Sequence, residues 1–240
     1  MREGSFDIVT CNYENVLGSV RSDSCARFGR NHVDCASFGD VVRMAVRDRS
    51  LLLGPVCKLF RKDLFDGVDF YDGAAIGEDY CMCVEVFRKA SRVRCLDVVL
   101  YSRFIQEGSV SHSGYTAGHA AGVRNYRRMN EELSGEFPEL EPYITGYHVQ
   151  YELAAVTAMG RNLAVDRGVL SVIRSDIGRN LCTLLGIGQI PPAFKVSMLL
   201  ILASPMLFIR LFHAFYLMER LSMERLSSLP LASLLFVRKG

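Results

Sequence analysis

The chain has 240 residues, of which 50% are hydrophobic and 22% charged, the composition of a globular protein with a sizeable core. Its 28 basic and 26 acidic residues leave a net charge of +2, so no basic field points to a nucleic-acid partner. The N-terminus lacks the apolar core of a secretory signal peptide, which predicts a cytoplasmic protein. Because the cytoplasm is reducing, we expect the eight cysteines to be buried free thiols rather than to form disulfides or bind zinc.

The first elements are a strand, a loop and two helices. β-Branched and aromatic residues over 6–13 predict a strand, and the polar stretch 20–37 predicts a loop. Ser37 is suited to cap a helix over 38–47. The apolar residues over 57–65 have helical spacing, which predicts a second helix.

Residues 67–77 form a turn-rich stretch before the next regular elements. A helix that opens on two acids is expected over 78–90. A strand over 93–101 and a glycine- and serine-rich loop over 104–115 follow. Strand and helix signals thus alternate up to residue 115, as in an α/β protein.

The pattern becomes helical after residue 115, with helices expected over 117–133, 143–165 and 169–185. A final apolar stretch over 195–226 has basic residues at both ends. Its uncharged segment 196–209 is shorter than the ~20 residues of a membrane-spanning helix, and a proline interrupts it. We predict an α/β part over residues 1–115 and an α-helical region over residues 116–240.

The strongest local signal for chemistry is Gly77-Glu78-Asp79, which opens the helix expected over 78–90. Carboxylates at this position stabilise the positive end of a helix, which is an ordinary capping role. One of them could instead act as a general base at the rim of a cleft. Because a helix N-terminus lowers the pKa of a carboxylate, the second interpretation requires burial or the neighbouring acid to offset that effect.

A second signal is Tyr101-Ser102-Arg103, followed by a loop with glycine, hydroxyls and His112. Arginine forks onto phosphate oxygens and glycine allows close backbone approach, so this loop can hold a diphosphate. An ordinary surface loop has the same composition. Lys58 is a further candidate, with a solvated lysine on a helix as the simpler interpretation.

The five histidines form no H-E-x-x-H motif or close pair. His119 and His148 are therefore interpreted as ordinary helix residues. No P-loop, G-x-S-x-G elbow or G-x-G-x-x-G fingerprint occurs, which argues against the chemistries that depend on them.

Over about residues 6–115 these signals resemble, in order, the acceptor-side half of family 2 glycosyltransferases of the GT-A fold. Each motif is weak alone, but five in this order at these spacings are specific. The motifs are Lys58-Leu59-Phe60-Arg61 with Leu64, Val68-Asp69-Phe70, Gly77-Glu78-Asp79-Tyr80, Tyr101-Ser102-Arg103 and Gly108-Ser109-Val110-Ser111. The resemblance implies a partial, Rossmann-like GT-A fold without its N-terminal nucleotide-binding half.

The resemblance also implies roles for single residues. Asp79 matches the catalytic base of the family, with Glu78 beside it, in a transfer that inverts the sugar. Lys58 matches a residue on the acceptor side of the cleft. Cys57 stands where many relatives have asparagine, which questions a polar role at that position.

Further roles concern the donor. Tyr101, Arg103 and Ser109 match the loop that closes near the diphosphate, and His112 matches a metal ligand of some relatives. The family holds Mg²⁺ or Mn²⁺ on the nucleotide-sugar donor with an Asp-x-Asp motif, a hard-cation site of oxygen ligands. No Asp-x-Asp precedes the strand expected over 6–13, so we expect a truncated chain that is inactive alone.

The implied activity is sugar transfer from a nucleotide-sugar donor to a glycan or lipid-linked acceptor in cell-surface polysaccharide synthesis. The alternative is a non-catalytic remnant or accessory module that binds a glycan or a partner. Basic residues around the apolar stretch 190–226 suit peripheral contact with the inner face of the cell membrane. Burial of those helices against the α/β part would suit the same pattern equally.

Overall fold

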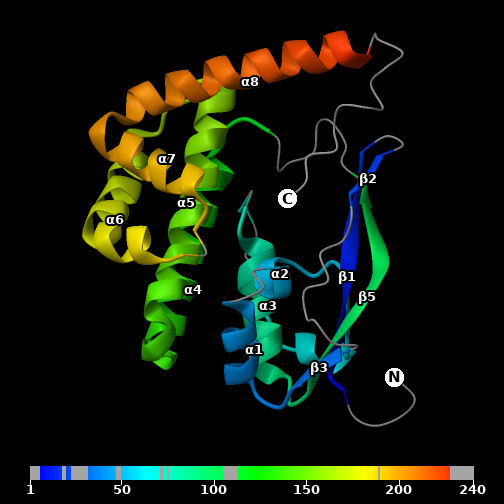
Figure 1. Ribbon diagram of the computed structural model, residues 1–240. Coiled ribbons are helices and arrows are strands. Elements are labelled where there is room, and N and C mark those ends of the chain that lie inside the picture. Colours follow the sequence, from blue (N-terminus) through cyan, green and yellow to red (C-terminus); the bar gives the residue numbers. More distant parts are fainter. Residues whose placement is uncertain are drawn as a thin grey trace. The chain divides into compact units, whose positions relative to one another are not determined.

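The described residues of the chain form two compact units (Figure 1). The α/β unit contains residues within 6–70 and 82–104, and the helical unit residues within 73–81 and 113–221. This order confirms the predicted α/β part followed by a helical region. The computed structural model describes residues 6–17, 20–22, 32–46, 50–70, 73–74, 76–104, 113–188 and 190–227.

Strand β1 (Ile8–Leu17) is the centre of the mixed sheet in the α/β unit. Strand β5 (Val93–Phe104) runs parallel to it along one side. Strands β4 (Lys58–Phe60) and β2 (Val20–Ser22) pair with β1 in antiparallel fashion near its start and its end. Strand β3 (His32–Cys35) pairs only with the start of β5, so no described strand covers the rest of that edge.

The predicted strands over 6–13 and 93–101 are confirmed, but two other predictions for this unit are wrong. The stretch 20–37 contains β2 and β3 in place of a continuous loop. Residues 57–65 form β4 and a 3₁₀ helix (Lys62–Phe65) in place of an α-helix. The reason in each case is pairing with a strand that is distant in sequence, which local residue spacing does not report.

The α/β unit also contains helices α1 (Phe38–Ala45) and α2 (Ser50–Leu53) and most of α3 (Glu78–Lys89). The Ser37 side chain accepts a hydrogen bond from the backbone N–H of Asp40 at 3.2 Å, which confirms the predicted cap of α1. From Met82 onward α3 belongs to the α/β unit, where Phe87 packs edge-on against Phe60 of β4. The described cysteines are free; four are buried as predicted, but two are half-buried and Cys182 is exposed, so the prediction of burial does not hold for all of them.

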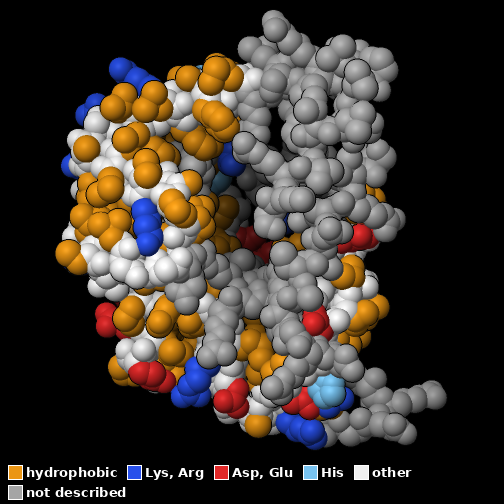
Figure 2. Space-filling model, in the orientation of Figure 1, with side chains coloured by type: hydrophobic (Ala, Val, Ile, Leu, Met, Phe, Trp, Pro, Cys, Tyr) orange, Lys and Arg blue, Asp and Glu red, His pale blue; other side chains and the backbone are white. Residues whose placement is uncertain are grey.

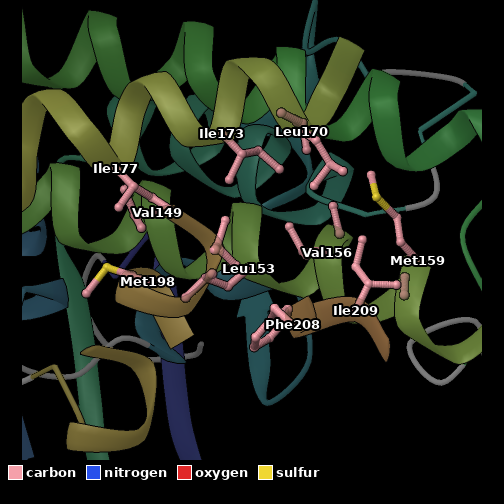
Figure 3. Packing of buried hydrophobic residues seen from close by; sticks show 14 of the residues in the cluster. Val149, Leu153, Val156, Met159, Leu170, Ile173, Ile177, Met198, Phe208 and Ile209 are labelled. Atoms are coloured by element: carbon pink, nitrogen blue, oxygen red, sulfur yellow. The ribbon is translucent and has the colours of Figure 1, made fainter. Parts of the chain in front are cut away.

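The helical unit consists of five long helices and the first turn of α3 (Figure 1). All five contribute to one apolar core, with Val123, Val156, Ile173, Met198 and Ile209 as one example from each helix, and Figure 3 shows part of this core. Of the described helices, none combines the length and apolarity needed to cross a membrane. The helices are α4 (Ala117–Glu136), α5 (Glu141–Asn162), α6 (Arg167–Gly186), α7 (Pro192–Ala203) and α8 (Pro205–Ser227).

The carboxylate of Asp7 connects three segments of the α/β unit. It is 4% exposed, and its Oδ1 accepts a hydrogen bond from the Arg61 guanidinium at 2.6 Å. Its Oδ2 accepts from the backbone N–H groups of Ser91 (2.6 Å) and Arg92 (3.1 Å). Asp7 thereby ties the start of β1 to the end of β4 and to the turn that leads into β5.

We expect Asp7→Ala to lower the free energy of unfolding by about 3 kcal/mol, because two backbone donors and one guanidinium lose a charged acceptor. Asp63→Ala is the matched control, since Asp63 also pairs with Arg61 at 2.6 Å but is exposed. The control should lose little stability. Denaturant unfolding followed by circular dichroism measures both, and equal losses would contradict the connecting role of Asp7.

Candidate functional site

Glu78 and Asp79 lie in the first turn of α3, as the sequence predicts. Gly77, just before them, has a φ of 83°, a left-handed conformation that glycine adopts without strain. A Cβ at Gly77 would approach the Tyr126 ring to 3.2 Å, and a Cβ at Gly122 would clash with the carbonyl oxygen of residue 76. Helix α4 therefore lies directly against this turn and determines where α3 begins.

A stack of tyrosine rings fastens the start of α3 to the neighbouring helices. The ring centroids of Tyr80 and Tyr126 are 4.0 Å apart, and those of Tyr126 and Tyr151 are 3.8 Å apart. The Tyr80 hydroxyl donates a hydrogen bond to Oδ1 of Asn130 at 2.9 Å. These contacts hold the two carboxylates of the first turn on a rigid support.

The two carboxylates have different environments. Asp79 is exposed, whereas Glu78 is half-buried and its Oε2 has no hydrogen-bond partner among the described residues. Burial raises the pKa of Glu78; a hydrogen bond from its own backbone N–H opposes the rise, and the charge of Asp79 adds to it. Burial therefore offsets the lowering of the carboxylate pKa by the helix N-terminus, and it does so at Glu78.

Three other predicted residues lie in the α/β unit. Lys58 is on β4 rather than on a helix, and its Nζ donates to the carbonyl oxygens of Gly54 (2.5 Å) and Val56 (3.2 Å). Lys58 thus closes the turn before β4. Tyr101 and Arg103 are exposed near the end of β5 and, two residues apart on a strand, lie on the same face.

The predicted Ser109 and His112 lie outside the described residues. Glu78 and Asp79 belong to the helical unit, and Lys58 and the exposed pair on β5 belong to the α/β unit. The single cleft that would join these residues therefore remains a prediction.

A second cluster of functional side chains, which the sequence analysis missed, lies in the helical unit. His148 and Glu152 are one turn apart on α5, and Asp176 projects from α6. Nε2 of His148 lies 3.2 Å from Oε1 of Glu152 and 3.5 Å from Oδ2 of Asp176. The side chains of His148, Glu152 and Asp176 are 9%, 1% and 7% exposed. The interpretation of His148 as an ordinary helix residue did not anticipate these neighbours.

Charge is partly balanced within this cluster. Burial alone would lower the pKa of His148, but the Asp176 and Glu152 carboxylates raise it to about 9. Burial raises the pKa of Glu152. Burial opposes ionisation of Asp176, yet His148 and Arg127 hold its pKa below the ordinary value. Arg127 binds Oδ1 of Asp176 at 2.9 Å and leaves Oδ2 directed at the cluster.

Comparison with known proteins finds no matching family model, no similar curated protein and no similar solved structure. Functional inference consequently depends on the motif order and on the side-chain geometry described above.

We expect Glu78→Gln to stabilise the chain at pH 7 and to lose that effect near pH 4. Because the folded state favours the protonated acid, the contribution of Glu78 is fully present below its unfolded pKa of about 4.3 and is lost as pH rises through its higher folded pKa. Glutamine cannot ionise, so the variant does not lose this stability as pH rises. Thermal unfolding at both pH values measures the difference.

Glu132→Gln, which alters an exposed acid on α4, serves as the control and should show no such pH-dependent gain. A Glu78→Gln variant that is equally or less stable than the parent at pH 7 would mean that the Glu78 carboxylate is well solvated.

Proposed function

We propose that this chain is the acceptor-side part of a family 2-like glycosyltransferase that moves a sugar from a nucleotide-sugar donor to a glycan or lipid-linked acceptor. The observation that carries the proposal is the pair of carboxylates at the start of α3. A glycine with positive φ and a tyrosine stack hold the pair, and burial raises the pKa of Glu78. A pair held in this way, with Asp79 exposed to an acceptor and Glu78 half-buried beside it, suits general-base catalysis.

In the proposed reaction a carboxylate takes the proton of the acceptor hydroxyl. The hydroxyl oxygen then bonds to the anomeric carbon while the nucleoside diphosphate leaves from the opposite face, which inverts the sugar. The motif resemblance assigns the base to Asp79, and its exposure allows contact with an acceptor. Glu78 is half-buried beside it, and we assign it a positioning role, in which it holds the first turn of α3 and influences the charge of Asp79.

The backbone at Cys57 supports the resemblance. Its φ of 64° lies in the left-handed region, where asparagine is several-fold enriched among non-glycine residues. The asparagine that many relatives have at this position would therefore meet a conformational need. The substitution by cysteine leaves that local conformation in place, and a polar contact by residue 57 is not required.

The end of β5 also supports the proposal. Ligands of open α/β sheets bind outside the carboxyl ends of the parallel strands, and Tyr101 and Arg103 lie at such an end. Arg103 is exposed there and suits contact with a diphosphate. The ammonium group of Lys58 binds backbone carbonyls of the 54–56 turn, so we assign Lys58 to holding that turn on the acceptor side rather than to direct catalysis.

The Asp-x-Asp motif with which the family holds the cation of the donor does not occur in the 240 residues. We assign the site of that cation to a nucleotide-binding segment outside this sequence. The edge of β5 beyond Leu96, which no described strand covers, suits pairing with such a segment. Leu100 and Phe104, each 66% exposed, provide apolar side chains at the same place.

The test uses the longest reading frame that contains this chain, expressed with any nucleotide-binding partner encoded beside it. Sugar incorporation into lipid and glycan acceptors is measured from a mixture of labelled nucleotide sugars. We expect Asp79→Asn to lower transfer by about 100-fold or more, with the fold retained, because a general base contributes at least that factor. Glu132→Gln should transfer at the parental rate. Unchanged transfer by Asp79→Asn, or no transfer by the parent, would favour the accessory-module alternative.

Helices α7 and α8 favour a peripheral membrane contact for the same protein. Met198 and Phe208 are buried in the core of the helical unit, so part of the tail packs internally. Leu207, Leu211 and Phe215 are exposed and, four residues apart, form one stripe along α8. Figure 2 shows hydrophobic side chains gathered on the surface of the helical unit. Such a stripe suits the interfacial region of a lipid bilayer, where a lipid-linked acceptor would lie.

We expect the chain to co-sediment with anionic liposomes. The double variant Leu211→Ser/Phe215→Ser should reduce the bound fraction at least about tenfold, because two apolar side chains no longer bury their surface in the lipid. Tyr143→Ser/Leu185→Ser, which changes two exposed residues elsewhere on the helical unit, is the matched control. Equal binding by the two double variants would exclude α8 as the contact surface.

A further inference from the structure

The cluster of His148, Glu152 and Asp176 has the arrangement of a metal site. One ligand atom of each residue lies within 4.8 Å of the others, and the three side chains come from two packed helices. Zinc ligands at about 2.1 Å from the ion in tetrahedral geometry lie about 3.4 Å from each other. Nε2 of His148 lies 3.2 Å from Oε1 of Glu152 and 3.5 Å from Oδ2 of Asp176, close to that value.

The polar atoms of this cluster are buried without hydrogen bonds. Both oxygens of Glu152, Oδ2 of Asp176 and Nε2 of His148 have no hydrogen-bond partner among the described residues. The contacts between them have the distances of ion pairs but not the angles of hydrogen bonds. Buried polar atoms in this state are costly, and a cation at the point where they converge would remove the cost.

We propose that His148, Glu152 and Asp176 bind a divalent transition-metal ion, for which Zn²⁺ is the best fit. Imidazole with two carboxylates suits zinc, whereas Mg²⁺ and Ca²⁺ prefer six or more oxygen ligands. Three protein ligands leave a fourth position for water or a small ligand. This proposal does not depend on the glycosyltransferase proposal.

Arg127 has a positioning role in the proposed site. Its guanidinium holds Oδ1 of Asp176 at 2.9 Å and leaves Oδ2 for the ion, as partners of ligating carboxylates commonly do. Arg127 also contacts Glu131 at 3.4 Å, and the Glu131 side chain is exposed, unlike the proposed ligands. Glu131 therefore offers a control acid that shares the same arginine without sharing the site.

The experiment uses the full chain after chelation, titrated with Co²⁺ as a spectroscopic probe and with Zn²⁺ in thermal unfolding. We expect visible Co²⁺ d–d absorption and a rise in melting temperature with Zn²⁺. Glu152→Gln, which keeps the side-chain volume, should weaken Co²⁺ binding by at least about 100-fold and abolish the Zn²⁺ shift. Glu131→Gln should behave as the parent. Asp176→Asn is a second site variant in case Glu152→Gln does not fold.

Because the chain has eight cysteines, the near-ultraviolet region of the Co²⁺ spectrum decides which ligands bind. A d–d spectrum without thiolate charge-transfer bands supports the proposed site. Thiolate bands, or equal Co²⁺ binding by the parent and Glu152→Gln, would overturn it. Absence of Co²⁺ and Zn²⁺ binding would also overturn it and identify the cluster as a metal-free ion-pair network. None of these readouts involves sugar transfer, so they are independent of the proposed activity.

Discussion

The arrangement of the α/β unit depends on the parallel pairing of β1 with β5, and Asp7 secures that pairing. A parallel pair needs a crossover connection, and here the last part of the crossover is α3 with the turn that follows it. Asp7 accepts hydrogen bonds from the backbone of that turn and from Arg61. Because Asp7 binds the turn that leads into β5, it secures the register at the start of the pair, where Ile8 lies opposite Val93. Two register shifts further along then place Tyr101 opposite Tyr13 and Arg103 opposite Asn15.

The start of α3 is constrained in a different way, by aromatic stacking rather than by charge. Tyr126 lies between Tyr80 of α3 and Tyr151 of α5, and its ring also stacks near His148 at 6.3 Å. A continuous series of rings thus joins the carboxylates of the candidate catalytic turn to the buried histidine cluster.

Both candidate sites contain features that a fold selected for stability alone would not keep. Oε2 of Glu78, both carboxylate oxygens of Glu152 and Oδ2 of Asp176 lack hydrogen-bond partners among the described residues. Such groups lower stability unless a ligand, proton or ion completes them. Their presence in two places within the helical unit, beside an otherwise apolar core, is typical of functional positions.

Several features of this protein were determined by sequence alone, because their causes are local. Ser37 predicts the cap of α1, and Pro205 predicts the break before α8, since caps and breaks depend on a few adjacent residues. The acids at the start of α3 were predictable for the same reason. The tertiary structure alone decided β3 and β4, which exist because β5 and β1 offer backbone partners distant in sequence.

The histidine cluster likewise combines one feature that the sequence contains with others that only the tertiary structure decided. The spacing of His148 and Glu152, one helical turn apart, was the only local signal for it, and that spacing is common in helices. Asp176 lies on another helix, and only the packing of α5 against α6 brings its carboxylate within 3.5 Å of His148. Burial, charge balance and convergence of ligand atoms are properties of packed helices, so the tertiary structure alone could decide them.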